Sequence, residues 1–333
     1  MIFAVTILVR FFQVASRQGA LDPVGPRALH IEHLFWFIFW ICLFVFVVVN
    51  VLFWYGAKRR VLAGENPRGI IENPDGDRKA AWGVGFAVAF TVVVLFTVLF
   101  LSLRASRVVQ ATSAENPVTI EITGHQWWWE VVYPDSQSDL QISTANEIHV
   151  PIHERIAVVT KSVDVIHSFW APNITGKRDL IPGYASSLSF EVDKPGIYRG
   201  QCAEFCGLQH AHMGFLIVAE SRDEFESWKQ NQLRDAPEPV SKATSHGREV
   251  FLSHACVMCH TIRGTDAASH MGPDLTHLAS RREIAAGTLP NVRGALAGWI
   301  LDPQSIKPGN HMALNIIGGE ELNDLLDYLG TLK

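Results

Sequence analysis

The chain has 333 residues, of which 48% are hydrophobic and 18% are charged, and its formal net charge is −5. So much apolar content excludes a disordered chain, and the lack of a basic excess argues against nucleic-acid binding. The mean hydropathy of +0.14 is high for a soluble protein. Five cysteines are too few for a disulfide-rich secreted scaffold, and the length suits about two domains.

Two long apolar runs lie in the N-terminal third of the chain. Leu34 to Tyr55 and Ala80 to Leu103 contain no charged residue, and the 22 residues of the first run would span roughly 33 Å as a helix. Buried helices of a soluble protein are the alternative, but two uncharged runs of this length favour a transmembrane hairpin. We therefore predict transmembrane helices over residues 34–55 and 80–103.

The charges around the hairpin predict its orientation. The loop at 56–79 contains six Lys or Arg residues, and basic loops tend to stay in the cytoplasm. Segment 1–33 and the part of the chain after the hairpin are then external, on the periplasmic side of a bacterial inner membrane. Met1 to Val9 is apolar but precedes Arg10 and Arg17, the reverse of a secretory signal. The sequence leaves open whether residues 1–20 are a leader that is cleaved or a segment that is retained.

Residues 115–228 consist of short stretches rich in Val, Ile and aromatic residues, separated by Gly, Pro, Asn and Asp. Seven strands of this kind predict a β-sandwich or a small barrel. They are expected at 118–122, 127–133, 148–151, 156–161, 187–192, 196–200 and 215–219. A helix at 222–233 would close this domain, which is acidic, with 7 basic and 16 acidic residues.

A polar, Pro-containing linker at 229–245 separates this domain from the C-terminal part. Residues 246–333 show helical patterns, among them 247–253 and 320–329, and predict an all-α domain whose last helix packs on its first. So short a linker would hold the two outer domains at a millimolar effective concentration.

One loop of the middle domain concentrates soft metal ligands. Cys202, Cys206, His210 and Met213 fall between two expected strands, and thiolate, thioether and imidazole together suit copper. A mononuclear blue-copper site needs a single Cys. Two thiolates suit instead a pair of bridged copper ions, each with its own imidazole. A disulfide between the two cysteines is the alternative.

The second imidazole must come from elsewhere, and His167 lies 35 residues before Cys202, in a segment we place between strands. We expect His125, His149 and His153 to be ordinary surface or core histidines and His212 to be a bystander. At least one of the tryptophans at 127–129 is expected to pack in the sandwich core, because strand side chains alternate between the two faces.

On these residues the middle domain resembles the binuclear copper domain of cytochrome c oxidase subunit II, a cupredoxin sandwich. The family patterns D-V-x-H-S-F, C-x-E-x-C-G-x-x-H-x-x-M and G-H-Q-W-x-W occur at 164–169, 202–213 and 124–129. A two-helix hairpin before the sandwich fits as well. The resemblance extends over residues 20–225.

The resemblance implies a role for each matching residue. His167 and His210 would each bind one copper ion, Cys202 and Cys206 would bridge both, Met213 would bind one ion, and the main-chain carbonyl of Glu204 would bind the other. In the family the side chain of this Glu also reaches a magnesium ion shared with subunit I. Trp127 matches the residue through which electrons reach the copper pair.

A second motif is found in the tail, where residues 256–260 read C-V-M-C-H, the attachment signature of c-type haem. Cys256 and Cys259 would form thioethers with the haem, and His260 would be the proximal iron ligand. A zinc site is the alternative, but the tail has no third cysteine. With its flanking helices, this part resembles a class I cytochrome c domain.

The sixth iron ligand is expected to be Met312, in a loop that contains Pro and Gly as in the cytochrome c family. His311 is the competing ligand and would lower the haem potential, whereas a thioether raises it. Met258 and Met271 would need awkward loops, because they lie inside or just after the attachment motif.

The combination resembles subunit II of caa3-type cytochrome c oxidases. This implies electron transfer from haem c to the copper pair and on to haem a of subunit I. Oxygen would be reduced there, at haem a3 and copper B, with proton translocation. The implied partners are subunits I and III, membrane lipid, and cytochrome c or a cytochrome c reductase as donor. The alternatives are a subunit of a copper-containing nitric oxide reductase and, in a different class, a membrane-anchored copper-binding assembly protein.

Overall fold

The structure is a computed structural model that describes residues 18–62, 74–110, 117–137 and 140–333. The segment considered above as a leader and the central part of the 56–79 loop lie outside these residues. The described residues form two compact units, one with residues 29–62 and 74–110, the other with residues 18–28, 117–137 and 140–333.

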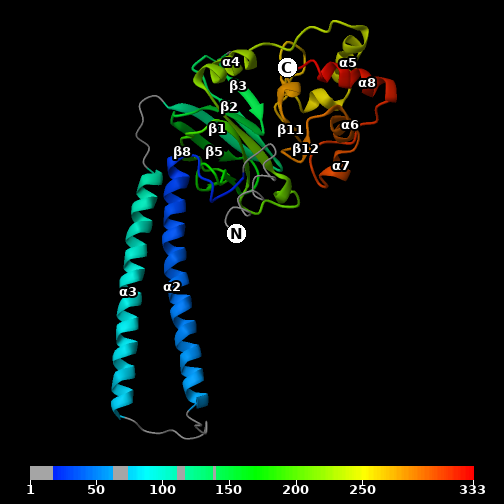
Figure 1. The fold of residues 1–333 in the computed structure, drawn as a ribbon. Helices are drawn as coiled ribbons and strands as arrows, with labels where there is room; N and C mark the ends of the chain where they lie inside the picture. The colour runs from blue at the N-terminus through cyan, green and yellow to red at the C-terminus, as the bar shows by residue number, and fades with distance from the viewer. Residues whose placement is uncertain (1–17, 63–73, 111–116, 138–139) are drawn as a thin grey trace, which may run out of the picture. The chain divides into compact units, whose positions relative to one another are not determined.

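The first unit contains two long helices, α2 (Pro26–Leu62) and α3 (Pro74–Gln110) (Figure 1). Within them, Pro26–Arg59 and Arg78–Arg107 are long and apolar enough to cross a membrane. The two predicted apolar helices are therefore confirmed. Each helix is longer than its apolar run, because its backbone continues into polar sequence at both ends.

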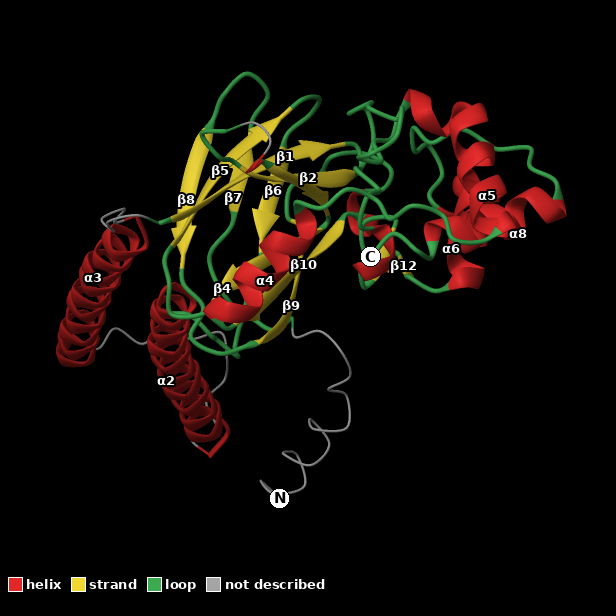
Figure 2. Cartoon of the chain, turned by 90° about the horizontal axis from the view of Figure 1, so that it is seen from above, coloured by secondary structure: helices red, strands yellow, loops and turns green. Residues whose placement is uncertain are grey.

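The middle domain is a sandwich of two five-stranded sheets (Figure 2). Its strands are β1 (Val118–His125), β2 (Trp128–Tyr133), β3 (Ile142–Ala145), β4 (Glu147–Pro151), β5 (Ile156–Ser162), β6 (His167–Trp170), β7 (Arg178–Leu180), β8 (Ser186–Phe190), β9 (Gly196–Cys202) and β10 (Gly214–Glu220). One sheet has the order β3-β2-β1-β5-β8 and the other β4-β10-β9-β6-β7. The predicted cupredoxin-like sandwich is confirmed, with three strands more than the seven expected.

The core between the sheets follows from alternation along the strands. Ile120 and Ile122 of β1 are fully buried, whereas their neighbours are not. Trp129 packs edge-on against Phe169 and Phe215, with ring centroids 6.1 and 5.4 Å away. Trp129 is thus the core tryptophan that alternation predicts within residues 127–129.

Residues 18–28 lie against the sandwich, although no sequence pattern indicated this. The amide of Val24 donates to the carbonyl of Asn173, and the amide of Asp193 donates to the carbonyl of Val24. The guanidinium of Arg27 donates to Ser189 Oγ at 2.7 Å. These residues of the segment predicted to be external therefore form part of the same unit as the sandwich.

The predicted closing helix is present as α4 (Arg222–Gln232) and begins with a capping box between Ser221 and Glu224. The C-terminal domain contains α5 (Lys242–Ser253), α6 (Arg293–Leu301), α7 (Pro303–Ile306) and α8 (Gly319–Leu329). It also contains a short hairpin of β11 (Glu283–Ile284) and β12 (Leu289–Pro290). The predicted helical domain is confirmed.

The last helix packs on the first, as predicted. A methyl group at Gly247 of α5 would lie 2.0 Å from the carbonyl oxygen of Asp324 in α8 and 2.9 Å from Tyr328 Cβ. Only a residue without a side chain allows the two backbones to approach so closely. His246 of α5 and Asp324 of α8 also form an ion pair of 2.7 Å across this helix crossing.

The linker is shorter than predicted and is not a free tether. It runs from the end of α4 to the start of α5, and Arg263 of the C-terminal domain donates to the carbonyls of Gln232 and Arg234. The amide of Ala236 donates in turn to the carbonyl of Arg263. Hydrogen bonds to main-chain carbonyls hold this segment, and the number of polar residues in the sequence could not reveal them.

Candidate metal centres

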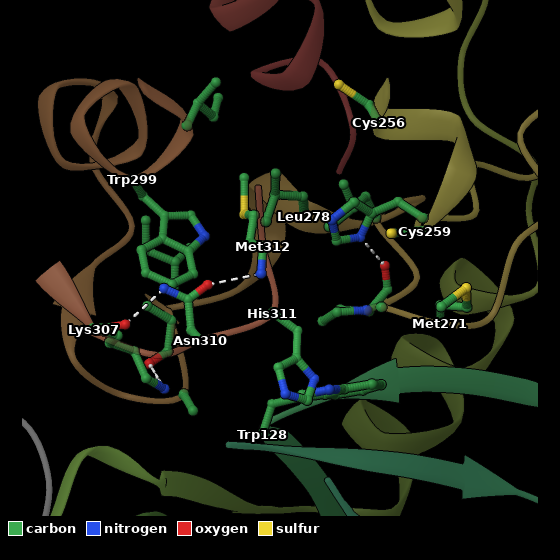
Figure 3. A pocket seen from close by; sticks show the side chains of 18 of the residues that line it. Trp128, Cys256, Cys259, Met271, Leu278, Trp299, Lys307, Asn310, His311 and Met312 are labelled. Carbon is green, nitrogen blue, oxygen red and sulfur yellow. Dashed lines mark hydrogen bonds between the residues drawn. The ribbon is translucent and has the colours of Figure 1, made fainter. Parts of the chain in front are cut away.

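A cavity of about 550 Å³ lies mainly in the C-terminal domain and is closed on one side by residues of the middle domain, among them Trp128 (Figure 3). Its volume is within the usual range of cofactor sites. The four predicted haem-binding residues all line it: Cys256, Cys259, His260 and Met312. Both cysteines are free thiols, as thioether formation with a haem requires. The lining is mainly apolar and includes Trp299 and Leu278.

The His260 ring is oriented by the main chain. Its Nδ1 lies 2.7 Å from the carbonyl oxygen of Pro273, which leaves Nε2 as the nitrogen available to a metal. Burial lowers the pKa of His260, so the ring is held neutral, the form that binds iron. Gly272 lies against the same ring, because a Cβ there would be 2.9 Å from its Cε1.

The loop before Met312 is also held in place. The amide of Met312 donates to Asn310 Oδ1 at 2.8 Å, and its carbonyl accepts from Gln304 Nε2 at 3.0 Å. Met258 and Met271 are 68% and 75% exposed, so the geometry favours Met312 over these two methionines. His311 also lines the cavity, and its ring lies 6.4 Å from the ring of Trp127.

The cavity wall contains a buried cation that the sequence reasoning missed. Arg281 lines the cavity, and its Nε is buried with no hydrogen-bond partner among the described residues. Burial lowers the pKa of this guanidinium. A buried donor without a partner suits an acidic group, such as a haem carboxylate. The apolar lining, the neutral imidazole and this cation therefore fit a haem.

The two thiols of the middle domain are brought together by a strand and the loop that follows it. Cys202 ends β9, and its amide donates to the carbonyl of Met213 next to β10. The Sγ atoms of Cys202 and Cys206 lie 3.8 Å apart as free thiols, and both residues are 3% exposed. A disulfide needs about 2.05 Å between its sulfurs, so the disulfide alternative is not the form seen in the structure.

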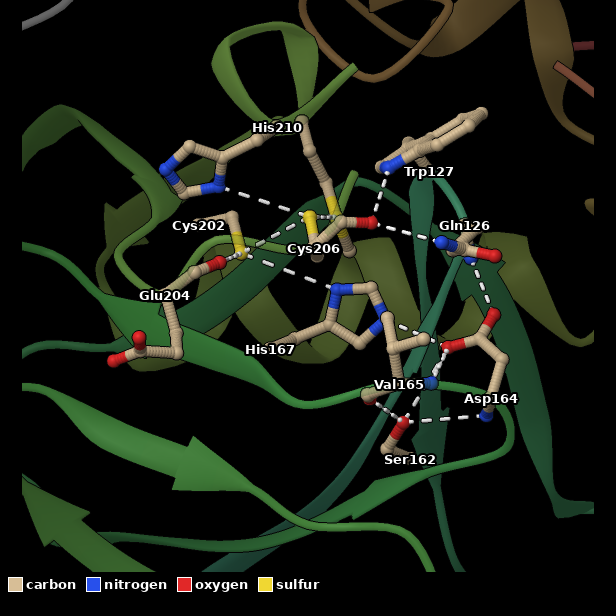
Figure 4. Close-up of polar contacts among 11 residues, drawn as sticks. Gln126, Trp127, Ser162, Asp164, Val165, His167, Cys202, Glu204, Cys206 and His210 are labelled. Atoms are coloured by element: carbon tan, nitrogen blue, oxygen red, sulfur yellow. Dashed lines mark hydrogen bonds and ion pairs between the residues drawn. The ribbon is translucent and has the colours of Figure 1, made fainter. Parts of the chain in front are cut away.

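Each thiol has its own imidazole (Figure 4). His167 Nδ1 lies 3.9 Å from Cys202 Sγ, and His210 Nδ1 lies 3.7 Å from Cys206 Sγ. His167 is the first residue of β6, so the prediction that it lies between strands is wrong. Its place in the sheet fixes the ring next to the loop that carries Cys202.

Two further donors complete the arrangement. Met213 Sδ lies 3.9 Å from Cys206 Sγ, and the main-chain oxygen of Glu204 lies 3.2 Å from Cys202 Sγ. All six predicted copper-site residues thus converge on one buried point. Two soft sulfurs, two imidazoles, a thioether and a carbonyl fit a pair of copper ions.

The electrostatics of the site favour bound cations. Hydrogen bonding with Cys206 lowers the pKa of the Cys202 thiol strongly, and the same interaction raises the pKa of Cys206. Burial lowers the pKa of His167, but Cys202 and Asp164 outweigh this effect and raise it overall. Metal ions that bind both sulfurs would displace protons from this pair.

Trp127 lies directly beside this cluster. It stands in the turn before β2, not in the strand where it was expected. Its Nε1 donates to the carbonyl oxygen of Cys206 at 2.9 Å, and the residue is 7% exposed.

Three of the other four histidines considered in the sequence analysis have side-chain partners of their own. His212 lies 2.9 Å from Gln209, His125 lies 3.3 Å from Glu130, and His149 lies between Glu147 and Glu220.

Comparison with known proteins agrees with both centres. The family model for the periplasmic domain of cytochrome c oxidase subunit II matches residues 118–221, and the cytochrome c model matches residues 244–333. Cytochrome c oxidase subunit 2 of Alkalihalophilus pseudofirmus is 33% identical over 94% of this chain and 90% of that protein. The subunit 2 of Bacillus subtilis is 30% identical over 85% of this chain and 83% of that protein.

Among solved structures, the periplasmic domain of cytochrome oxidase subunit II from Bradyrhizobium japonicum is 33% identical to this chain. The alignment covers 36% of this chain and 95% of that domain, with a TM-score of 0.34. The sequence similarity to the two bacterial subunits extends over nearly the whole chain. The chain therefore belongs to the cytochrome c oxidase subunit II family, in the caa3-type form that carries a cytochrome c domain fused to its C-terminus.

Proposed function

We propose that this chain holds one haem c and one pair of copper ions and relays electrons between them. The haem would be attached to Cys256 and Cys259, with His260 and Met312 as axial ligands. The copper pair would be held by His167, Cys202, the main-chain oxygen of Glu204, Cys206, His210 and Met213. As subunit II of the oxidase, the chain passes electrons to subunit I, and the oxygen chemistry belongs to another subunit of the complex.

The observation that supports this proposal best is that each of two buried thiols faces its own imidazole. The same chain also contains a cavity lined by the residues of a c-type haem attachment motif. The bound haem and copper supply one-electron redox chemistry. The protein residues supply the ligands, their orientation and a dry environment. Cys202, Cys206 and Met213 are each at most 3% exposed, and such shielding from water tunes the potential of a metal centre.

We propose Trp127 as the residue through which electrons reach the copper pair. Its indole N–H contacts the main chain of Cys206, and its ring lies 6.4 Å from the ring of His311, the neighbour of Met312. Trp127 thus stands between the ligand sets of the two centres.

The Glu204 side chain is proposed to reach a magnesium ion shared with subunit I, as the family resemblance implies. In this chain its carboxylate is 44% exposed and lies 3.3 Å from Lys177 Nζ. A bound magnesium ion would have to displace this exposed ion pair, which is a weak interaction. Further oxygen ligands would have to come from the partner.

The proposed partners are subunits I and III, with cytochrome c or a cytochrome c reductase as donor. We propose a bacterial inner membrane as the location, with loop 56–79 cytoplasmic and the domains at 115–228 and 246–333 periplasmic. The acidic copper domain would attract a basic donor, so the rate of reduction by soluble cytochrome c is expected to fall with salt. If the chain were instead a subunit of a nitric oxide reductase, the catalytic subunit of that complex would contain different metals.

Electron paramagnetic resonance of the full-length, metal-loaded chain tests the copper pair. We expect a hyperfine pattern from one unpaired electron shared by two copper nuclei, and metal analysis should give two coppers for each haem. The pattern of a single copper nucleus would refute the pairing. An oxidised disulfide between Cys202 and Cys206 in the metal-loaded protein would do so as well.

A further inference from the structure

A buried lysine of the haem domain reaches the turn that carries Trp127. Lys307 is 3% exposed, and its Nζ donates to the carbonyl of Trp127 at 2.9 Å and to the carbonyl of Ala285 at 3.1 Å. Next to it, Gln209 of the copper loop donates to the carbonyl of Pro308 at 2.8 Å. The loop after α7 therefore contacts the copper domain directly.

Lys307 also closes a continuous set of hydrogen bonds between the two centres. On the copper side, Trp127 Nε1 donates to the carbonyl of Cys206, and the carbonyl of Trp127 accepts from Lys307 Nζ. On the haem side, Asn310 Nδ2 donates to the carbonyl of Lys307 at 2.7 Å, and Asn310 Oδ1 accepts from the amide of Met312 at 2.8 Å (Figure 3). One end is a proposed copper ligand and the other a proposed haem ligand.

We propose that Lys307 is a positioning residue for electron transfer between the two domains, because its terminal amine fixes the Met312 loop on the main chain of Trp127. This inference rests on the proposed function of the two centres. The step moves one electron from the haem domain to the copper domain. The haem centre is thereby oxidised by one electron, the copper centre is reduced by one electron, and no bond is formed or broken.

The surroundings of Lys307 explain why a buried lysine is suited to this place. No carboxylate lies within ion-pair distance of it among the described residues, so main-chain carbonyls are its hydrogen-bond partners. The Lys307 amine carries several N–H donors and satisfies acceptors from both domains at once. The carbonyl of Ala285 also accepts from Thr288 Oγ1 at 2.7 Å. An apolar side chain of similar length would therefore leave the carbonyl of Trp127 without this donor, which weakens the docked arrangement.

A second anchor holds the same interface. Arg199 of β9 donates to both carboxylate oxygens of Glu283, each at 3.0 Å, and to the carbonyl of Gly287 at 2.8 Å. The amide of Gly214 donates to the carbonyl of Ala286. With both anchors closed, Trp127 is 7% exposed. A soluble cytochrome would then have to reduce the haem, because it could not reach Trp127.

The test uses full-length, metal-loaded Lys307→Met, with Lys242→Met as the control at an exposed lysine of the same domain. The haem is reduced by a light flash, and its reoxidation by the copper centre is followed by absorption. We expect loss of these hydrogen bonds in K307M to shift the equilibrium between docked and open domains about tenfold. The transfer rate should fall by the same factor as the docked population. The control should keep the wild-type rate.

Two measurements separate positioning from a general structural defect. The haem and copper potentials are determined for each variant, so that a change in driving force is recognised. Direct reduction of the copper centre by added soluble cytochrome c should rise in K307M by the same factor as the open population. The fold-loss in transfer and the fold-gain in direct reduction should multiply to about ten. Lys307→Gln retains a donor and should restore part of the transfer rate.

If K307M does not fold, Arg199→Gln loosens the same interface from the other anchor. It should give the same rise in direct copper reduction, and K307Q then tests the lysine itself. The role of Lys307 would be overturned if K307M or K307Q transferred electrons from haem to copper at the wild-type rate and soluble cytochrome c reduced the copper centre no faster than in the wild type. If the wild type itself shows no transfer from haem to copper, the proposed function fails, and this role fails with it.

Discussion

Asp164 Oδ1 lies 2.8 Å from Nε2 of His167, the ring nitrogen that does not face Cys202. The same carboxylate accepts hydrogen bonds from the amides of Gln126 and Val165, each at 2.6 Å. Burial raises the pKa of Asp164, but these hydrogen bonds lower it overall, so the group is an anion. It therefore holds Nε2 protonated and leaves Nδ1 free for a metal.

Asp164→Asn is expected to weaken copper binding roughly 10- to 100-fold, the usual effect of losing a partner of a ligating histidine. The fold should be kept, since an amide fills the same space. Competition with a copper chelator measures the affinity. Asp223→Asn, at an exposed position of α4, is the control and should bind copper like the wild type. Equal affinities of D164N and the wild type would contradict the orienting role.

Met312→Ala tests the axial haem ligand. Loss of the thioether should abolish the sulfur–iron charge-transfer absorption of the oxidised haem and lower its potential. Met271→Ala removes a thioether that also lines the cavity but is 75% exposed, so it should change neither property. Absorption spectroscopy and redox titration of both variants give the answer. Retention of the band in M312A would assign the ligand elsewhere.

Gly247→Ala is expected to destabilise the haem domain. The added methyl group would lie 2.0 Å from the Asp324 carbonyl oxygen, and overpacking of this kind costs about 1–3 kcal/mol. Gly294→Ala in α6 is a matched control, because a Cβ there meets nothing within 4 Å. It should stabilise the domain by about 0.5–1 kcal/mol. Denaturant unfolding followed by haem absorption distinguishes the two, and equal stabilities would be inconsistent with the tight crossing.

The His149 cluster should make stability depend on pH. Its Nδ1 lies 2.9 Å from Glu220 and its Nε2 lies 3.2 Å from Glu147. Burial lowers the pKa of His149, but the two carboxylates outweigh burial and raise this pKa overall. Burial raises the pKa of Glu147, but hydrogen bonds from His149 and from the amide of Arg282 outweigh burial and lower this pKa overall.

The contribution of His149 is then fully present below its unfolded pKa of 6.5 and is lost as pH rises through its higher folded pKa. Glu147 contributes above 4.5 and loses its contribution as pH falls through its lower folded pKa. We expect the Tm to fall on the alkaline side in the wild type, and to fall less in His149→Gln. Identical pH profiles would exclude His149 as the cause.

The sequence predicted the strands that have long β-branched runs, such as those at 156–161 and 215–219, and it missed β3, β6 and β7. These three strands have only four, four and three residues. Their pairing depends on neighbouring strands and not on their own composition. The membrane helices were found, but hydropathy marks only the part that crosses lipid and not the polar turns that continue each helix.

Local spacing identified the ligands of the 202–213 loop that are side chains and those of the haem attachment motif, because soft donors and this motif are local patterns. The main-chain oxygen of Glu204 came only from the family resemblance, and His167 lies far from the loop in the sequence. The contacts between domains could not be predicted in this way. Lys307, Arg281 and Arg199 look like ordinary surface cations in the sequence, and only the fold brings them to buried carbonyls, the cavity wall or a carboxylate. The linker was misjudged for the same reason.

The crossing of α5 and α8 at Gly247 brings the first and last helices of the haem domain together. A module that is closed on itself in this manner can be appended through a single covalent junction, since neither of its ends is needed elsewhere to complete its core. A mobile carrier can thus become a permanent part of a larger enzyme without any redesign of its interior.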